Sequence, residues 1–178
     1  MRRGKDPAAL GRFLFAALVG ALLHFTHAWS GGAPAAGAFS AVNESVWEHM
    51  KLLFWPLFFL TGIELLLRRP PDFLAPRAVS AAAGLALLPA AFYTYTGILG
   101  RDIPAADIAV FLLADAAVFW LEARLSRQKC LTGRGAQAAG LLAMWALAFL
   151  FVLYTFRPPH IPLFRDPLTL GYGPPPAP

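Results

Sequence analysis

The sequence predicts an all-α integral membrane protein, a bundle of about five transmembrane helices. Three observations lead to this prediction. Hydrophobic residues make up 58% of the 178 residues and charged residues only 14%, a balance more apolar than that of soluble domains. Several apolar stretches are as long as the roughly 20 residues that a helix needs to cross a bilayer. The basic residues lie in short clusters between these stretches, which is typical of membrane topology.

The apolar stretches are continuous, and such runs form helices in a membrane because every backbone polar group must be paired within its own segment. Pro56 and Pro89 fall inside two of them and are expected to bend the helices, since proline removes a backbone donor. One transmembrane domain over residues 1–178 is expected, with a proline-rich tail at 157–178 lying over the helix ends. The predicted helices cover residues 10–29, 46–67, 78–99, 105–125 and 136–156.

Basic residues predict the orientation of the bundle, because Lys and Arg beside helix ends are retained in the cytoplasm. One side of the predicted topology carries most of them. We therefore expect the N-terminus in the cytoplasm and the C-terminus outside. The crowded side has Arg2, Arg3, Lys5, Arg12, Arg68, Arg69, Arg77, Arg124, Arg127, Lys129 and Arg134, and the other side has Arg101, Arg157 and Arg165.

Two other interpretations of the charge pattern are weaker. A net charge of +5 could indicate nucleic-acid binding, but charges at helix ends are explained by the bilayer, so we expect the lipid bilayer and no nucleic acid as partner. The basic N-terminus, the first apolar run and the small residues at 35–38 also resemble a cleaved signal peptide. That run carries His24 and His27 and is long enough to span outright, which favours a retained helix.

Polar residues collect at the predicted outer leaflet, including all four histidines. Two histidines three residues apart share a helix face, and histidines with carboxylates are ligands suited to zinc or a similar divalent metal. Simpler roles compete: acids at a helix start offset the helix dipole, with Asn43 or Ser40 as N-cap, and aromatic residues form interfacial belts. The candidate ligands are His24, His27, His49 and His160; the nearby carboxylates are Glu44, Glu48 and Asp107.

Three acids lie deeper in the predicted helices. Asp115 falls near the middle of the fourth helix, where an ionised group costs several kcal/mol unless it is paired, protonated or facing water. This position makes Asp115 a functional candidate. Glu64 and Glu122 lie closer to basic loops, where we expect pairing or extension toward the interface.

The residues at 43–51, Asn-Glu-Ser-Val-Trp-Glu-His-Met-Lys, resemble a motif of small bacterial multi-pass membrane proteins known only as a domain of unknown function. Segments 24–32, 93–97, 107–108 and 155–167 extend the resemblance over nearly the whole chain. It implies a protein of the bacterial plasma (inner) membrane whose recognisable positions are the outer-leaflet residues. It implies no activity.

The leading hypothesis is a metal-dependent hydrolase or transferase that acts on a lipid or lipid-linked substrate at the outer leaflet. The alternatives are a small proton- or cation-coupled transporter using Asp115, and a non-catalytic membrane partner subunit. The sequence leaves open whether the chain is an enzyme, and its oligomeric state. In the leading hypothesis His24 and His27, with His49 or His160, bind the metal; Glu48 is the general base, with Glu44 and Asp107 as further catalytic candidates; Lys51 or Arg157 binds an anionic group, and Tyr93, Tyr95 and Asp115 are further substrate contacts.

Overall fold

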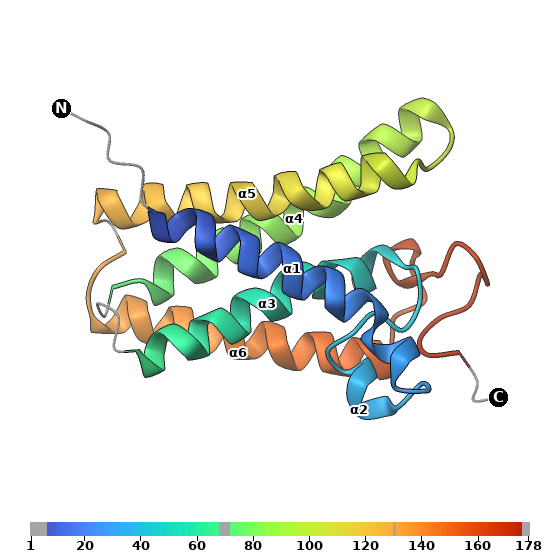
Figure 1. Cartoon of the computed structure of the whole chain (residues 1–178), viewed down its shortest axis with the longest axis horizontal. Coiled ribbons are helices and arrows are strands. Elements are labelled where there is room, and N and C mark those ends of the chain that lie inside the picture. Colours follow the sequence, from blue (N-terminus) through green and yellow to red (C-terminus); the bar gives the residue numbers. More distant parts are fainter. Residues whose placement is uncertain (1–6, 68–71, 130, 176–178) are drawn as a thin grey trace.

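The computed structural model describes residues 7–67, 72–129 and 131–175, and this part of the chain is a helical bundle (Figure 1). Among the described residues, five helices are long and apolar enough to cross a membrane, which confirms the predicted fold class. The basic residues predicted at 2–5 and 68–69 lie outside the described residues. The long helices are α1 (Pro7–Trp29), α3 (Val46–Leu66), α4 (Leu74–Leu99), α5 (Pro104–Gln128) and α6 (Arg134–Phe156); α2 (Pro34–Gly37) and the 3-10 helix η1 (Pro162–Phe164) are short.

Helix α3 is the central element of the bundle. In its most apolar window 61% of the residues are buried, compared with 11–28% in the other four long helices. Its buried side chains include Phe54 and Leu57, neither of which is exposed to solvent, and Phe54 packs on Phe151 of α6 with ring centroids 4.9 Å apart. The other long helices carry exposed large apolar side chains, among them Leu113 and Trp145, as expected of faces that meet lipid.

Close packing of α5 and α6 against α4 depends on two glycines. A Cβ at Gly84 in α4 would lie 2.3 Å from Val118 of α5, and one at Gly140 in α6 would lie 2.7 Å from the backbone of Ala75. Small residues allow helices in membranes to approach closely and gain van der Waals contact. Gly84 and Gly140 therefore set how near α5 and α6 come to α4.

Three helix ends differ from the predicted ends by three or four residues: the start of α1, the start of α4, and the end of α5, which lies at Gln128 rather than at residue 125. Helix α4 begins at Leu74 rather than at residue 78, and α1 begins at Pro7 rather than at residue 10. Arg77, predicted in a loop, therefore lies inside α4. Arg12, which was counted among the charges beside the first helix, lies inside α1. Pro56 and Pro89 lie inside α3 and α4 as expected, and the bends at these prolines stay predictions.

The two ends of the bundle carry different segments of the chain. The tail end holds α2, the start of α3, the α4–α5 turn and the C-terminal tail, and the loop end holds the start of α1 and the α5–α6 turn. Figure 1 shows the α4–α5 hairpin reaching away from the tail at the tail end. The α4–α5 turn begins at Gly100, whose φ of 68° is the left-handed conformation that commonly ends a helix.

The C-terminal tail packs over the tail end, as the sequence predicts. Phe164 of η1 is 5% exposed and contacts Trp47 of α3 and Tyr154 of α6, with centroids 4.7 Å and 5.6 Å away. Asn43 Nδ2 donates to the carbonyl of Gly173 at 2.9 Å. The tail is folded rather than simply extended, since it contains η1 and a β-bridge between Arg165 and Tyr172.

Candidate metal centre

The segment before α3 determines where Glu44 lies. Ser45 is the N-cap of α3, and its Oγ accepts a hydrogen bond from the Glu48 amide at 3.4 Å. The predicted caps, Asn43 and Ser40, are wrong: Asn43 Oδ1 accepts from the Ser45 amide at 2.9 Å, and Ser40 Oγ accepts from the His27 amide at 2.8 Å. Glu44 thus precedes the helix, and its side chain is free to turn toward α1.

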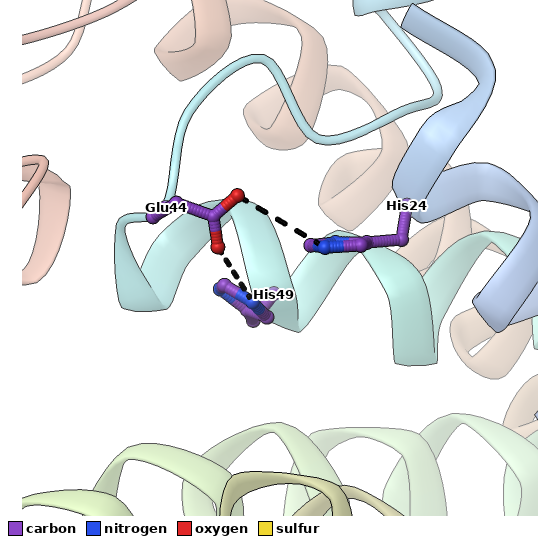
Figure 2. A group of neighbouring side chains, drawn as sticks. All are labelled: His24, Glu44 and His49. Carbon is purple, nitrogen blue, oxygen red and sulfur yellow. Dashed lines mark ion pairs between the residues drawn. The ribbon is translucent and has the colours of Figure 1, made fainter. Parts of the chain in front are cut away.

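Three side chains meet at the tail end: His24 of α1, Glu44 of the loop and His49 of α3 (Figure 2). His49 Nε2 lies 3.5 Å from Glu44 Oε2, and His24 Nε2 lies 4.0 Å from Glu44 Oε1. One ligand atom from each side chain falls within 4.8 Å of the other two. Two imidazoles and one carboxylate are a common ligand set for zinc with an open fourth position.

The spacing and hydrogen bonding suit a tetrahedral ion. Zinc bonds of about 2.0–2.1 Å place tetrahedral ligand atoms about 3.3 Å apart, so only small side-chain movements are needed. His49 Nδ1 lies 3.0 Å from the Ser45 carbonyl, which can only accept a hydrogen bond, and Nε2 faces Glu44. A metal-binding histidine commonly donates its second nitrogen to a backbone carbonyl in this way.

The three side chains line a cavity of about 600 Å³. Apolar residues of α1, α3, α4 and α5 form most of its wall, including Ala21, Leu52, Phe92 and Phe111. Two acids, Asp102 and Asp107, enter from the α4–α5 side. The volume is in the range of small-molecule sites, which combine an apolar wall with a few polar groups.

Asp107 is held in place by a neighbouring tyrosine. The Tyr95 hydroxyl donates to the Asp107 carboxylate, and the Ile103 amide donates to the same hydroxyl at 3.3 Å. Tyr93 does not line this cavity but a smaller hollow beside it. Of the predicted tyrosines, Tyr95 therefore orients an acid, and Tyr93 lines the smaller hollow together with Glu44.

Glu48 and Lys51 form a buried pair on the other face of α3. Lys51 Nζ lies 2.6 Å from Glu48 Oε2 and donates to the Gly37 carbonyl at 2.7 Å and to Thr155 Oγ1 at 2.8 Å, so all three of its donors are used. Glu48 Oε2 also accepts from the Val42 amide at 3.0 Å. Lys51 is 0% and Glu48 2% exposed, and neither lines the cavity. Both side chains hold the 37–42 loop.

The other predicted histidines and Arg157 lie outside the three-residue group. The His27 ring packs against Gly37 of α2, and the His160 ring stacks on Tyr172 with centroids 4.5 Å apart. Arg157 follows α6 and is exposed. The structure therefore brings together two of the four histidines, and the carboxylate with them is Glu44.

The deeper acids have contrasting surroundings. Asp115 is 0% exposed, and within the described residues neither of its carboxylate oxygens has a hydrogen-bond partner. Glu64 and Glu122 are paired, as expected, and their partners are Arg77 and Arg12. Arg77 Nε and Nη2 donate to the two oxygens of Glu122 at 2.7 Å and 2.9 Å, and Nη2 donates to Glu64 at 2.7 Å. Arg12 Nε lies 3.2 Å from Glu64.

Two polar residues of the tail end line these spaces although no site role was predicted for them. Asp102 lines the large cavity, and Arg165 lines the smaller hollow. Arg165 was considered only as one of the basic residues that predict the orientation of the bundle. A signal for its placement is the Asp166-Pro167 pair followed by Thr169, a combination typical of a tight turn, which here brings Arg165 opposite Tyr172.

Comparison with known proteins identifies the family but no activity. Residues 11–174 match a family of unknown function, DUF6512, and the match spans most of the chain. No curated protein and no solved structure matches the chain.

Proposed function

We propose that this chain, which belongs to the DUF6512 family, is a metal-dependent hydrolase or transferase acting on a lipid or lipid-linked substrate. The observation that carries the proposal is the His24–Glu44–His49 group at an apolar cavity between helices that can span a membrane. The excess of Lys and Arg in the loops of the opposite end supports an orientation with the tail end outside. The substrate would then enter from the outer leaflet of the bacterial plasma membrane.

The bound metal, zinc or a similar divalent ion, would polarise the substrate and lower the pKa of a water molecule in the open position. Asp107 is the general base of this proposal, since it lines the same cavity and Tyr95 orients it. Water attacks the electrophilic atom of an ester, and its proton passes to Asp107. The bond to the leaving alcohol breaks, and that proton moves to the alcohol oxygen. In a transferase, an alcohol takes the place of water.

Glu44 and Glu48, predicted as catalytic residues, have other roles in this proposal. Glu44 becomes a metal ligand, because it is the carboxylate that faces both imidazoles. Glu48 becomes a positioning residue: together with Lys51 it holds the loop through Val42 and Gly37, and this loop leads to Glu44. A positioning residue is expected to alter metal affinity without contacting the substrate.

Metal analysis of the detergent-purified protein after equilibration with zinc tests the proposal. We expect one ion per chain in the wild type, and none in a His24→Ala, His49→Ala double variant. His160→Ala is the matched control, because this histidine lies at the same end but outside the group. Hydrolysis of a panel of lipid esters by the zinc-loaded protein is the functional readout. A wild type without stoichiometric metal, or a double variant that still binds it, would overturn the proposal.

Asp115 supports a second candidate function, a proton- or cation-coupled transporter. Its buried carboxylate without a partner in the described part of the chain is typical of residues on ion pathways in membranes. Asp115 lies seven residues before Glu122 and therefore on the same face of α5. Proton flux into proteoliposomes distinguishes the two functions: Asp115→Asn should abolish flux in a transporter, and it should leave zinc binding unchanged in either case.

A further inference from the structure

A smaller hollow of about 360 Å³ adjoins the large cavity. The two share Glu44, Val46, Phe92 and Pro167, so the candidate metal centre lies on their border. The wall of the hollow includes Arg165, Tyr93 and Tyr172. A ligand that reached from one space into the other would pass Glu44. Its apolar part would lie in the large cavity, and its other end would lie beside the cation Arg165 in the hollow.

The backbone around Arg165 is fixed by the fold of the tail. Asp166 is 5% exposed; its amide donates to the Gly171 carbonyl at 3.0 Å, and its carboxylate accepts from the Leu168 amide at 3.1 Å and from Thr169 Oγ1 at 2.6 Å. The Arg165–Tyr172 bridge closes the turn. Arg165 is therefore presented to the hollow from an ordered turn.

Most N–H donors of the Arg165 guanidinium form no hydrogen bond with the residues that the structure describes. Its Nε donates weakly to the Leu170 carbonyl at 3.4 Å, and Arg165 forms no ion pair with any residue that the structure describes. The other cations of the tail end differ: Lys51 is consumed by its buried contacts, and Arg101 and Arg157 line neither space. Arg165 is the cation whose position allows contact with a ligand at Glu44.

We propose that the hollow binds the phosphate group of the substrate, an inference that rests on the proposed function and specifies its substrate class. The substrate is an amphiphile with a phosphate head group and an apolar chain in the large cavity. Arginine matches phosphate oxygens through paired N–H donors. A divalent ion on two imidazoles and one carboxylate leaves a net charge of +1 at the border, and Arg165 adds a second positive charge in the hollow. Asp102 and Asp107 line the large cavity and not the hollow, so the hollow is the side that attracts a phosphate monoester.

The charges also predict coupling between metal and phosphate. Without a metal, the Glu44 carboxylate repels an anion on the border of the two spaces. With a divalent ion bound, the same position attracts it. Phosphate binding should therefore be stronger with zinc, and zinc binding stronger with phosphate, because coupling between two sites is reciprocal.

The test uses the full-length protein in detergent and three ligands, with and without zinc, in isothermal titration calorimetry. The first ligand is a dihexanoyl phosphonolipid, the analogue of phosphatidic acid in which a P–C bond prevents hydrolysis. The second is dihexanoylglycerol, which has the same chains and no phosphate, and the third is inorganic phosphate. With zinc, we expect the phosphonolipid to bind at least about tenfold more tightly than dihexanoylglycerol, the scale of a charge-assisted hydrogen bond.

Two variants with matched controls locate the two parts of the ligand. Arg165→Ala should remove the preference for the phosphonolipid and leave zinc affinity without lipid unchanged, whereas the exposed Arg157→Ala should keep the preference. Ala21→Trp fills the large cavity and should weaken the phosphonolipid but not inorganic phosphate. Leu18→Trp, an exposed position of α1 outside the cavity, should change neither.

The outcomes separate this inference from the proposed function. If zinc binds but Arg165→Ala keeps the full preference, the phosphate subsite is wrong and the metal centre stands. If zinc does not bind but Arg165→Ala still removes the preference, the proposed function is wrong and the phosphate subsite stands. If inorganic phosphate binds as tightly as the phosphonolipid and Ala21→Trp has no effect, the ligand is free phosphate and the lipid class is overturned.

Discussion

The two ends of the bundle each bring charged side chains together, and they do so in opposite ways. At the loop end, Arg77 is 0% exposed and donates to Glu122, Glu64 and Thr61. At the tail end, the side chains of His24, His49 and Glu44 are 28%, 33% and 44% exposed, and their closest polar atoms are 3.5–4.0 Å apart. The first group is closed and saturated, and the second is open and has unused ligand atoms.

The difference indicates what each group does. The loop-end group contains Arg12, Glu64, Arg77 and Glu122, which balance in charge and join α1, α3, α4 and α5. Buried charges are costly unless every member is paired, so such a group holds helices in one arrangement. The tail-end group has too few mutual contacts to stabilise the fold. The proposed metal would account for its arrangement.

Loss of Arg77 should have the largest effect on stability. Arg77→Met leaves Glu64 and Glu122 buried without their main cation, and we expect a loss of about 3–5 kcal/mol in the free energy of unfolding. Unfolding of the detergent-solubilised protein, followed by circular dichroism, measures it. Arg101→Met, an exposed position at the other end, should stay within about 0.5 kcal/mol. Equal effects of the two variants would contradict the structural role of the loop-end group.

The Glu48–Lys51 pair gives the next test, because it is buried and fully paired although it lies at the tail end. Lys51→Met leaves Glu48 buried without its cation, and we expect a loss of about 3 kcal/mol. Adding Glu48→Gln to this variant should recover part of the loss, because the unpaired charge is removed. If Lys51→Met were as stable as the wild type, a role in substrate binding would again be open for Lys51.

Zinc should change the free energy of unfolding only by binding to the His24–Glu44–His49 group. At a zinc concentration 100 times its Kd, binding to the folded state adds about 2.7 kcal/mol, measured as a rise in Tm in detergent. His49→Ala should lose this gain and His160→Ala should keep it. Protons compete with the metal for imidazole nitrogens, so the gain should shrink as the pH falls. A gain that persisted in His49→Ala would place the metal elsewhere.

The sequence was sufficient to predict the five long helices, because a continuous apolar run in a membrane can pair its backbone polar groups only as a helix. It was insufficient for the start of α4, because Arg77 looks like a loop charge until Glu64 and Glu122 are placed beside it. Arg12 was likewise counted only as a charge flanking the first helix, and its pairing with Glu64 was not predicted. The positions of the histidines and acids along the predicted helices were enough to place them at one end of the bundle. Which histidines meet depends on the path of residues 30–45, which brings Glu44 to His24 and turns Glu48 into the bundle, and no local pattern predicts that path.

The smallest effect is expected from the open group without metal. In the presence of a chelator, His49→Ala removes one partly exposed side chain and its hydrogen bond to the Ser45 carbonyl, which should cost less than about 1 kcal/mol. The same substitution abolishes the zinc-dependent gain, so a single residue would be nearly dispensable for the apo fold and essential for the ligand. Residues at functional sites commonly show this separation. A loss as large as that of Arg77→Met would mean that the tail-end group is also structural, and the contrast between the two ends would disappear.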